Sequence, residues 1–302
     1  MAVRLLDRPA NRPVWMENPT IAGRVSKFVV LAIVVIVMLF PFVYVLSVSL
    51  SNEKDLSGAN VALIPAHPTL AAYQQIFAGG VVTRALEVSI GVTAIGTVAC
   101  MVMTTMLAYG LSRTSHVPGS KFVLLLVLGT LLFSPGIIPN YLLIRYLGLL
   151  NNYSALIFPT LIVAFNLVVV RQFFMNIPED LIDASVIDGC NPLQTFRYVT
   201  LPLSKAVLAV VALFYGVSIW SDFFNALLYL NNTAMWPIQL VLRLYVLQGQ
   251  QLGGAQVSGQ PPPPALTIQM AVVVIATVPI LIVYPFLQKY FTQGVLSGAI
   301  KG

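Results

Sequence analysis

The stretch SKFVVLAIVVIVMLFPFVYVLSVSL, at residues 26–50, decides the fold class of this chain. After Lys27 it contains no charged residue. As a helix that rises about 1.5 Å per residue, such a run crosses the roughly 30 Å hydrocarbon core of a bilayer. It is longer than the apolar core of a cleavable signal peptide, and no small-residue cleavage site follows, so Met1 is expected to begin the mature chain. The stretch therefore predicts a membrane-spanning helix.

Five further apolar runs repeat this pattern along the chain. They lie near residues 85–111, 122–139, 153–174, 203–230 and 266–287. None has the alternating pattern of a membrane β-strand, and lipid offers no water to backbone groups that lack a hydrogen bond. The sequence therefore predicts an all-α membrane protein with six transmembrane helices.

The composition excludes several other classes of protein. Of the 302 residues, 58% are hydrophobic and 9% charged, whereas about 25% of the residues in a soluble domain are charged. The 16 Lys and Arg residues against 10 Asp and Glu residues give a net charge of +6. The basic residues are scattered along the chain, which argues against a nucleic-acid-binding face. Cys100 lies in an apolar run and Cys190 in a polar loop, so two free thiols are expected.

Lys and Arg also predict the orientation, because they are enriched on the cytoplasmic side of membrane proteins. Twelve lie on one side of the six predicted spans: Arg4, Arg8, Arg12, Arg24, Lys27, Arg113, Lys121, Arg171, Arg197, Lys205, Lys289 and Lys301. Four lie on the other side: Lys54, Arg84, Arg145 and Arg243. Both termini are therefore expected in the cytoplasm.

This orientation divides the chain into an N-terminal cytoplasmic segment at residues 1–25, a six-span transmembrane domain at residues 26–290 and a cytoplasmic tail at residues 291–302. Residues 231–265 then form an outer loop that contains a Gly/Gln-rich stretch and four consecutive prolines. This loop is interpreted either as a mobile spacer or as a contact for a partner.

A polar insert at residues 171–205 separates the fourth and fifth predicted spans. Pro178, followed by Glu179 and Asp180, is typical of a helix start, where a missing N–H costs nothing and negative charge is favourable. Gly189 predicts a left-handed stop. Asn191 and Pro192 predict the cap and first position of a second short helix at residues 193–200, which Pro202 would end.

The first of these helices is predicted to be amphipathic and acidic. Glu179 and Asp183 share one face; the apolar positions are Leu181, Ile182, Val186 and Ile187. Helices that lie on lipid headgroups are typically basic. Docking to a protein is therefore favoured over binding to the membrane surface.

The segment DASVIDGC at residues 183–190, followed by Leu201 and Pro202, resembles the EAA loop of bacterial ABC importer permeases. That loop has the pattern Glu-Ala-Ala-x-x-Asp-Gly-Ala, a spacer and Leu-Pro. Three positions differ: Asp183 replaces Glu, Ser185 replaces Ala, and Cys190 replaces Ala. Asp183 keeps the negative charge with a shorter reach, and the other two residues stay small enough for close packing.

Further motifs narrow the resemblance to carbohydrate-importing permeases of the maltose-permease type, and within them to the branch for complex or uronate-rich oligosaccharides such as alginate. These motifs are LIP at residues 63–65, TLAAY at 69–73, IPNYLL at 138–143, LGLLN at 147–151 and KYFTQGV at 289–295.

This resemblance implies a type I ABC importer permease bundle with cytoplasmic coupling helices in the cell inner membrane. The implied partners are a homologous second permease, two cytosolic ATPase subunits that hold ATP and magnesium, and an extracytoplasmic sugar-binding protein. The loop at residues 175–202 would dock on an ATPase subunit. The residues implied for this role are Glu179, Asp183, Ala184, Ser185, Asp188, Gly189, Cys190, Leu201 and Pro202.

The chain itself shows no catalytic motif. It lacks the GxxxxGK[ST] phosphate-binding sequence, so ATP is expected to bind elsewhere, and its two histidines, His67 and His116, have no neighbouring cluster of metal ligands. No cofactor and no metal site are therefore expected in this chain, and it is not an enzyme by itself.

Two acidic residues inside the predicted spans need an explanation, because charge in a membrane is costly. Glu87 follows Arg84 by three residues, which predicts an ion pair. Asp222 lies with Trp220, Ser221 and Asn225 in one polar and aromatic segment. This segment is interpreted either as a polar tie to another helix or as part of a sugar translocation path. The alternative function is an ion-coupled secondary transporter that uses Asp222 or Glu87.

Overall fold

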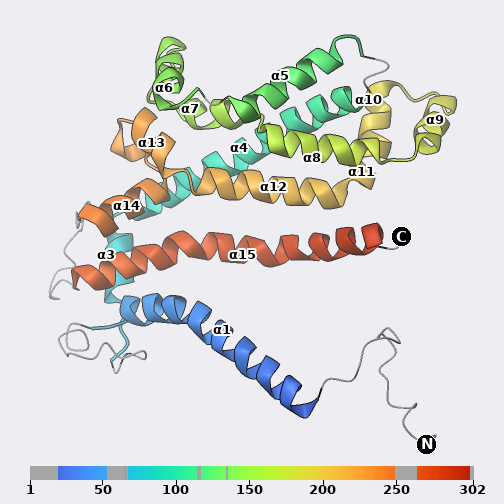
Figure 1. Cartoon of the computed structure of the whole chain (residues 1–302). Helices are drawn as coiled ribbons and strands as arrows, with labels where there is room; N and C mark the ends of the chain where they lie inside the picture. The colour runs from blue at the N-terminus through green and yellow to red at the C-terminus, as the bar shows by residue number, and fades with distance from the viewer. Residues whose placement is uncertain are drawn as a thin grey trace, which may run out of the picture.

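A computed structural model of the chain describes residues 20–52, 65, 67–113, 117–133, 135–248 and 264–299. All the regular elements in this part of the chain are helical (Figure 1). The predicted all-α fold class is therefore confirmed. The Gly/Gln-rich stretch of the predicted outer loop, most of the N-terminal segment and the end of the C-terminal tail lie outside the described residues.

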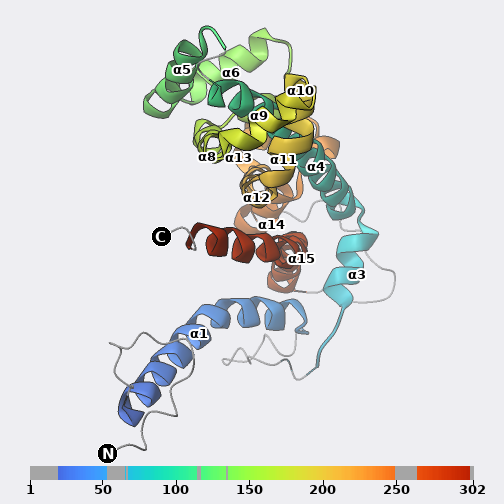
Figure 2. The same cartoon turned by 90° about the vertical axis from the view of Figure 1, so that its right-hand side faces the viewer.

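Three helices are long and apolar enough to cross a membrane: α1 (Ile21–Ser49), α4 (Val81–Ser112) and α15 (Ala265–Ala299), the last judged on its stretch to Val283. Helix α1 contacts α15 and lies away from α4 in both views (Figures 1 and 2). Only its last turn is buried, at Ser47, Val48 and Ser49. Most of α1 therefore presents apolar side chains to its surroundings.

Two predicted spans are broken. The fourth consists of α7 (Ser154–Ile157), the 3₁₀-helix η1 (Phe158–Thr160) and α8 (Ala164–Met175). The helical segment at 154–160 meets α8 at 52°. In the fifth, the helical segment at 192–203 meets α12 (Lys205–Trp220) at 84°. Beyond Trp220 a separate helix, α13 (Phe223–Tyr229), begins, so the expected continuous span at residues 203–230 was wrong.

The third predicted span is short. Helix α5 (Ser120–Leu132) has 13 residues, and after a break the chain continues as α6 (Ile137–Tyr146). Thirteen residues at about 1.5 Å each reach roughly 20 Å, less than a hydrocarbon core. By length and composition the described residues hold three spans, or up to five if each bent pair counts as one, so the number six is not confirmed.

Short elements gather at the two ends of the long helices (Figure 1). At one end lie α3 (Ala71–Ala78), α13, the 3₁₀-helix η3 (Thr233–Met235) and α14 (Ile238–Gln248). At the opposite end lie α9 (Glu179–Ile187), α10 (Pro192–Thr195) and α11 (Leu201–Leu203), joined through the π-helix η2 (Phe196–Thr200). The C-terminal end of α15 lies on this second side.

The packed core lies mainly among α4, α8 and α12, and a second buried cluster joins α3, α14 and α15 to the start of α4. In the first cluster the Tyr215 hydroxyl hydrogen-bonds to the Thr104 hydroxyl at 2.7 Å and accepts the Val163 N–H at 3.1 Å. Both side chains of the hydroxyl pair are almost fully buried. This network fixes α12 to α4 and to the residue that precedes α8.

Candidate functional site: the polar loop and the α12–α13 break

The polar loop begins as the sequence predicts. Pro178 stands just before α9, and Glu179 and Asp180 occupy its first turn. Asp188 follows the helix, and Gly189 has a φ of +82°, in the left-handed region that glycine adopts most easily. The N–H of Gly189 donates to the Val186 carbonyl at 3.0 Å. The predicted helix and its glycine stop are therefore confirmed.

The second short helix starts where expected and runs further than expected. Asn191 and Gln194 form a capping box at the start of α10, with hydrogen bonds of 2.8 and 2.9 Å. Pro202 does not end the helix, because the chain passes through the wider π-helix η2 and places this proline in the first turn of α11. A first-turn proline leaves no hydrogen bond unmade. The direction changes only at Ser204.

The exposure of the loop residues divides the predicted set. Glu179, Asp183, Ala184, Asp188, Gly189 and Pro202 are exposed, Cys190 and Leu201 are half-buried, and Ser185 is buried. The Ser185 hydroxyl hydrogen-bonds to that of Thr195 at 3.0 Å, which ties α9 to α10. A serine at this position thus has a role that the alanine of the EAA pattern could not fill.

The apolar positions of α9 do not form the single buried face that amphipathicity implies. Ile182 packs against the core cluster, whereas Leu181, Val186 and Ile187 are 45%, 57% and 84% exposed. A helix in water normally buries such side chains against protein. Among the described residues the core cluster covers one of the four, and the other three are exposed at different positions around the helix axis.

Tyr109, near the C-terminal end of α4, joins this loop to the bundle, and no sequence signal predicted this role. Its hydroxyl donates to the Pro192 carbonyl at 3.0 Å, and its ring centroid lies 4.9 Å from that of Phe196 and 6.5 Å from that of Phe174. The guanidinium carbon of Arg113 lies 4.9 Å from the same ring centroid. A single tyrosine in an apolar run cannot be distinguished from other core residues by sequence, because its contacts with the loop arise only in the folded chain.

Asp222 has a local structural role at the other end of α12. One carboxylate oxygen accepts the Asn225 backbone N–H at 3.1 Å, and the other accepts the Asn225 side-chain amide at 2.7 Å. Asp222 is therefore the N-cap of α13, a position that aspartate favours. The polar tie that the sequence suggested exists, but it runs within the segment and not to another helix. The residue before it, Ser221, is exposed.

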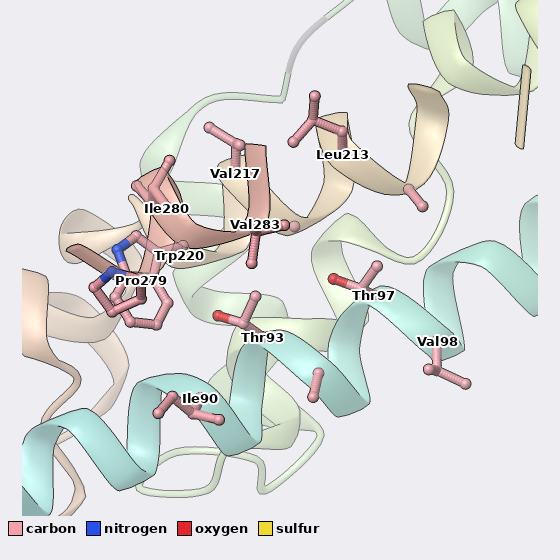
Figure 3. A pocket seen from close by; sticks show the side chains of 13 residues that line it. Ile90, Thr93, Thr97, Val98, Leu213, Val217, Trp220, Pro279, Ile280 and Val283 are labelled. Carbon is pink, nitrogen blue, oxygen red and sulfur yellow. The ribbon is translucent and has the colours of Figure 1, made fainter. Parts of the chain in front are cut away.

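Trp220 lies apart from this cap and lines a cavity of about 470 Å³ between α4, α12 and α15 (Figure 3). Its indole N–H donates to the Ala276 carbonyl at 3.2 Å, which ties α12 to α15. The cavity is almost entirely apolar; hydroxyls reach it from Thr93 and Thr97. Ser221, Asp222 and Asn225 are not among its lining residues, so the structure separates Trp220 from the other three members of the predicted path.

Asp222 borders a second, much smaller recess together with Ser89, Thr93 and Pro237. Burial first, and the negative charge of Asp222 second, raise the pKa of Tyr229, which lies in α13 beyond the end of the span. Arg243 of α14 supplies positive charge nearby, with its guanidinium carbon 4.7 Å from the ring centroid of Phe223. This end of α12 thus carries one capped carboxylate and one cation held against an aromatic ring.

The other predicted polar residues have ordinary structural roles. Glu87 and Arg84 form an exposed ion pair of 3.2 Å, as their spacing predicts. Cys100 and Cys190 are both free thiols. Within the described ranges, no group of three or more His, Cys, Asp or Glu side chains is placed to hold a metal ion.

Comparison with known proteins relates this arrangement to transport. A family model described as "Binding-protein-dependent transport system inner membrane component" matches residues 20–297. The polygalacturonan/rhamnogalacturonan transport system permease protein YtcP of Bacillus subtilis (strain 168) is 43% identical over 269 residues, which cover 88% of this chain and 94% of that protein. Protein LplC of the same organism is 42% identical over 291 residues, which cover 95% and 98%.

Among solved structures, a crystal structure of a bacterial ABC transporter involved in the import of the acidic polysaccharide alginate contains a similar chain. The TM-score is 0.85 at 27% sequence identity, and the match covers 91% of this chain and 100% of that chain.

Proposed function

This chain belongs to the family of binding-protein-dependent transport system inner membrane components, and from this premise we propose that it imports an acidic, uronate-containing oligosaccharide. It is a permease subunit of a sugar ABC importer and is not itself an enzyme. The family match across residues 20–297 carries this conclusion. It also confirms the predicted membership of the ABC importer permease family.

An ion-coupled secondary transporter is not favoured. The carboxylate of Glu87 is exposed and paired with Arg84, and both oxygens of Asp222 accept hydrogen bonds from Asn225. Neither acid is placed as an unpaired, buried relay of the kind that proton-coupled carriers use.

The charge of the proposed cargo is supported by two relatives and by one feature of the chain. The names of the 43% identical permease and of the similar solved transporter refer to polygalacturonan and to alginate, whose sugars carry carboxylates. In this chain the Asp222 carboxylate is already occupied by Asn225, and Arg243 lies close to the same segment. An acidic sugar would therefore meet less uncompensated negative charge here than the sequence suggests.

A gene deletion in the host, complemented by the wild-type chain, tests this cargo. Uptake of labelled trigalacturonate should fall by at least about tenfold in the deletion strain, while maltotriose uptake stays within about twofold of wild type. An alginate trimer serves as the second acidic probe and separates galacturonate from other uronates. Loss of maltotriose uptake alone would reject an acidic cargo and leave the importer itself intact.

We also propose that the loop at residues 175–202 docks on a cytosolic ATPase subunit, and that the complex contains two such subunits with ATP and magnesium, a second permease and an extracytoplasmic sugar-binding protein. The exposed apolar side chains of Leu181, Val186 and Ile187 beside the carboxylates of Asp183 and Asp188 support this role. Large apolar side chains that stand exposed among charged ones are typical of protein interfaces.

In this arrangement, residues 26–290 form the permease domain within the inner membrane. Residues 1–25 and 291–302 lie at its two ends, both on the cytoplasmic side.

Affinity purification of the tagged chain from mild detergent tests the docking. Asp183→Lys should lower the recovered ATPase subunit by about tenfold, because it reverses a charge in the interface. Glu87→Lys, which reverses an exposed acid at the opposite end of the molecule, is the matched control and should leave recovery unchanged. Equal recovery from both variants would reject the loop as the docking site.

The translocation path stays a proposal, with Trp220, Ser221, Asp222 and Asn225 as its candidate residues. Asparagine is also a good N-cap, so Asp222→Asn should keep α13 folded while it removes the negative charge. We expect complex yield to stay constant and uptake of trigalacturonate to rise, because the carboxylate that would repel an acidic sugar is gone. Unchanged trigalacturonate uptake per complex together with a reduced yield would assign Asp222 a purely structural role.

A further inference from the structure

An aromatic cluster lies around Tyr109 near the C-terminal end of α4, and none of the roles described above involves it. Four elements meet at Tyr109: α4 itself, the end of α8 through Phe174, the start of α10 through Pro192, and η2 through Phe196. Phe174 and Phe196 also contact each other edge to face, with centroids 6.5 Å apart. Residue 109 therefore touches the polar loop just where it starts and again in its middle.

The Tyr109 ring contacts both the loop and a cation. The ring of the buried Phe196 and the guanidinium carbon of Arg113 each lie 4.9 Å from its centroid. The Nη2 atom of Arg113 is buried and has no hydrogen-bond partner among the described residues. Contact with the ring therefore contributes to the stabilisation of this charge. A leucine at position 109 would remove the ring that Arg113 and Phe196 share.

Helix α4 carries this contact into the bundle. Arg171 of α8 donates from Nε to the Leu111 carbonyl at 2.9 Å, so the inner ends of α4 and α8 are joined beside Tyr109. Further along α4, Thr104 bonds to Tyr215 of α12, whose hydroxyl also accepts the Val163 N–H. The loop, α4, α8 and α12 are thus linked by direct side-chain contacts.

From these contacts we propose that Tyr109 is a positioning residue for energy coupling, which makes α4 move with the polar loop when a docked ATPase subunit displaces it. This inference rests on the proposed docking of the loop. A tyrosine suits the role because its ring has only two side-chain torsions to fix, while its hydroxyl adds a directional bond to the Pro192 carbonyl. Packed elements of this kind shift as units and do not deform continuously.

The test uses the whole complex in proteoliposomes, with purified sugar-binding protein and trigalacturonate as the probe. Two quantities are measured: the ATPase subunit that co-purifies with the chain, and the sugar imported per ATP hydrolysed. Tyr109→Phe keeps the ring and loses the bond to Pro192, so import per ATP should fall about threefold. Tyr109→Leu loses the ring as well, and import per ATP should fall at least about tenfold. Co-purification should stay within about twofold of wild type for both variants.

Tyr146→Leu is the matched control, because Tyr146 is 89% exposed at the opposite end of the bundle, and it should change neither quantity. Wild-type import per ATP in Tyr109→Leu would overturn the inference even if the variant were less stable, since Tyr109 would then be only structural. Loss of the ATPase subunit from Tyr109→Leu would also overturn it, because the tyrosine would then act in docking.

Asp183→Lys in the same assay separates this inference from the proposed function. If that variant keeps both the ATPase subunit and full import, the docking proposal fails independently of Tyr109. If it loses the subunit while Tyr109→Leu imports normally, docking is supported and the role of Tyr109 is rejected.

Discussion

Asn151 shows how one residue can fix two distant loops. Its φ is +57°, a left-handed conformation that asparagine tolerates better than most residues. Its N–H donates to the Tyr229 carbonyl at 2.8 Å, and its side-chain oxygen accepts the N–H groups of Asn231 and Asn232 at 3.2 and 3.0 Å. The asparagine of the LGLLN motif thus holds the segment after α13 against the segment after α6.

Replacement of Asn151 should therefore destabilise the chain through two separable terms. Asn151→Gly keeps the backbone conformation and loses two hydrogen bonds, for a cost of about 1–3 kcal/mol. Asn151→Ala loses the same hydrogen bonds and keeps a Cβ in the left-handed region, which alanine tolerates less well than glycine or asparagine, so it should cost roughly 1 kcal/mol more than Asn151→Gly. Thermal unfolding in detergent should rank wild type above Asn151→Gly and the alanine variant last. The exposed control Asn176→Ala should unfold with the wild type; if alanine equals glycine at position 151, the backbone term is absent.

At the scale of elements, the close crossing of α4 and α12 depends on a glycine. A Cβ on Gly96 would lie 2.9 Å from the Cδ1 atom of Ile219, closer than side chains normally approach. The contact is the far end of a flexible side chain, so a shift of Ile219 can relieve it. The crossing therefore tolerates a methyl group at position 96 only if this neighbour moves.

This geometry predicts a coupled pair. Gly96→Ala should destabilise the chain by about 1–3 kcal/mol through overpacking. In the background of Ile219→Val, which lacks Cδ1, most of that cost should disappear. Gly91 of the same helix has open space around its Cβ position, so Gly91→Ala should be neutral or stabilise by up to about 1 kcal/mol. A double-mutant cycle on thermal unfolding measures the pair, and additive effects would refute direct contact.

The glycine stop of α9 is the second element whose geometry can be tested. Gly189→Pro removes the N–H that bonds Val186 and demands a negative φ, so it should displace the loop and lower sugar import by at least about tenfold. Gly189→Ala has open space and costs only roughly 1 kcal/mol of backbone strain, so import should fall less.

Gly119→Ala is the matched control for this backbone strain, because Gly119 also has a positive φ and open space but precedes α5. Sugar import into right-side-out membrane vesicles is measured for all three variants. Full import by Gly189→Pro would show that the loop does not depend on this turn.

At the scale of the whole molecule, the polar loop and the Asp222 segment lie at opposite ends of the long helices (Figure 1). Lys and Arg divide twelve to four between the two predicted sides of the membrane. Because the positive side is usually cytoplasmic, the loop and both termini are expected inside the cell. The elements around α13 and α14 are expected outside.

Cysteine labelling tests this orientation directly. With Cys100 and Cys190 replaced by Ser, Thr233→Cys should react with a membrane-impermeant maleimide in spheroplasts, because residue 233 is exposed and is expected on the outer side. Ile187→Cys, at a position 84% exposed on α9, should react only after the membrane is permeabilised. The opposite labelling pattern would invert the topology and place the loop where no cytosolic ATPase could reach it.

The sequence by itself determined the membrane class, the helical fold, the start and glycine stop of the polar loop, and the family. These follow from apolar runs and from local rules that act within a few residues, such as a helix cap or a left-handed glycine. Only the tertiary structure decided that Asp222 caps α13, that Trp220 faces a separate cavity, and that Tyr109 holds the loop. Each of these depends on where the helices break and which side chains then meet, and contacts between residues as far apart as 109 and 192 leave no periodic signal in the sequence.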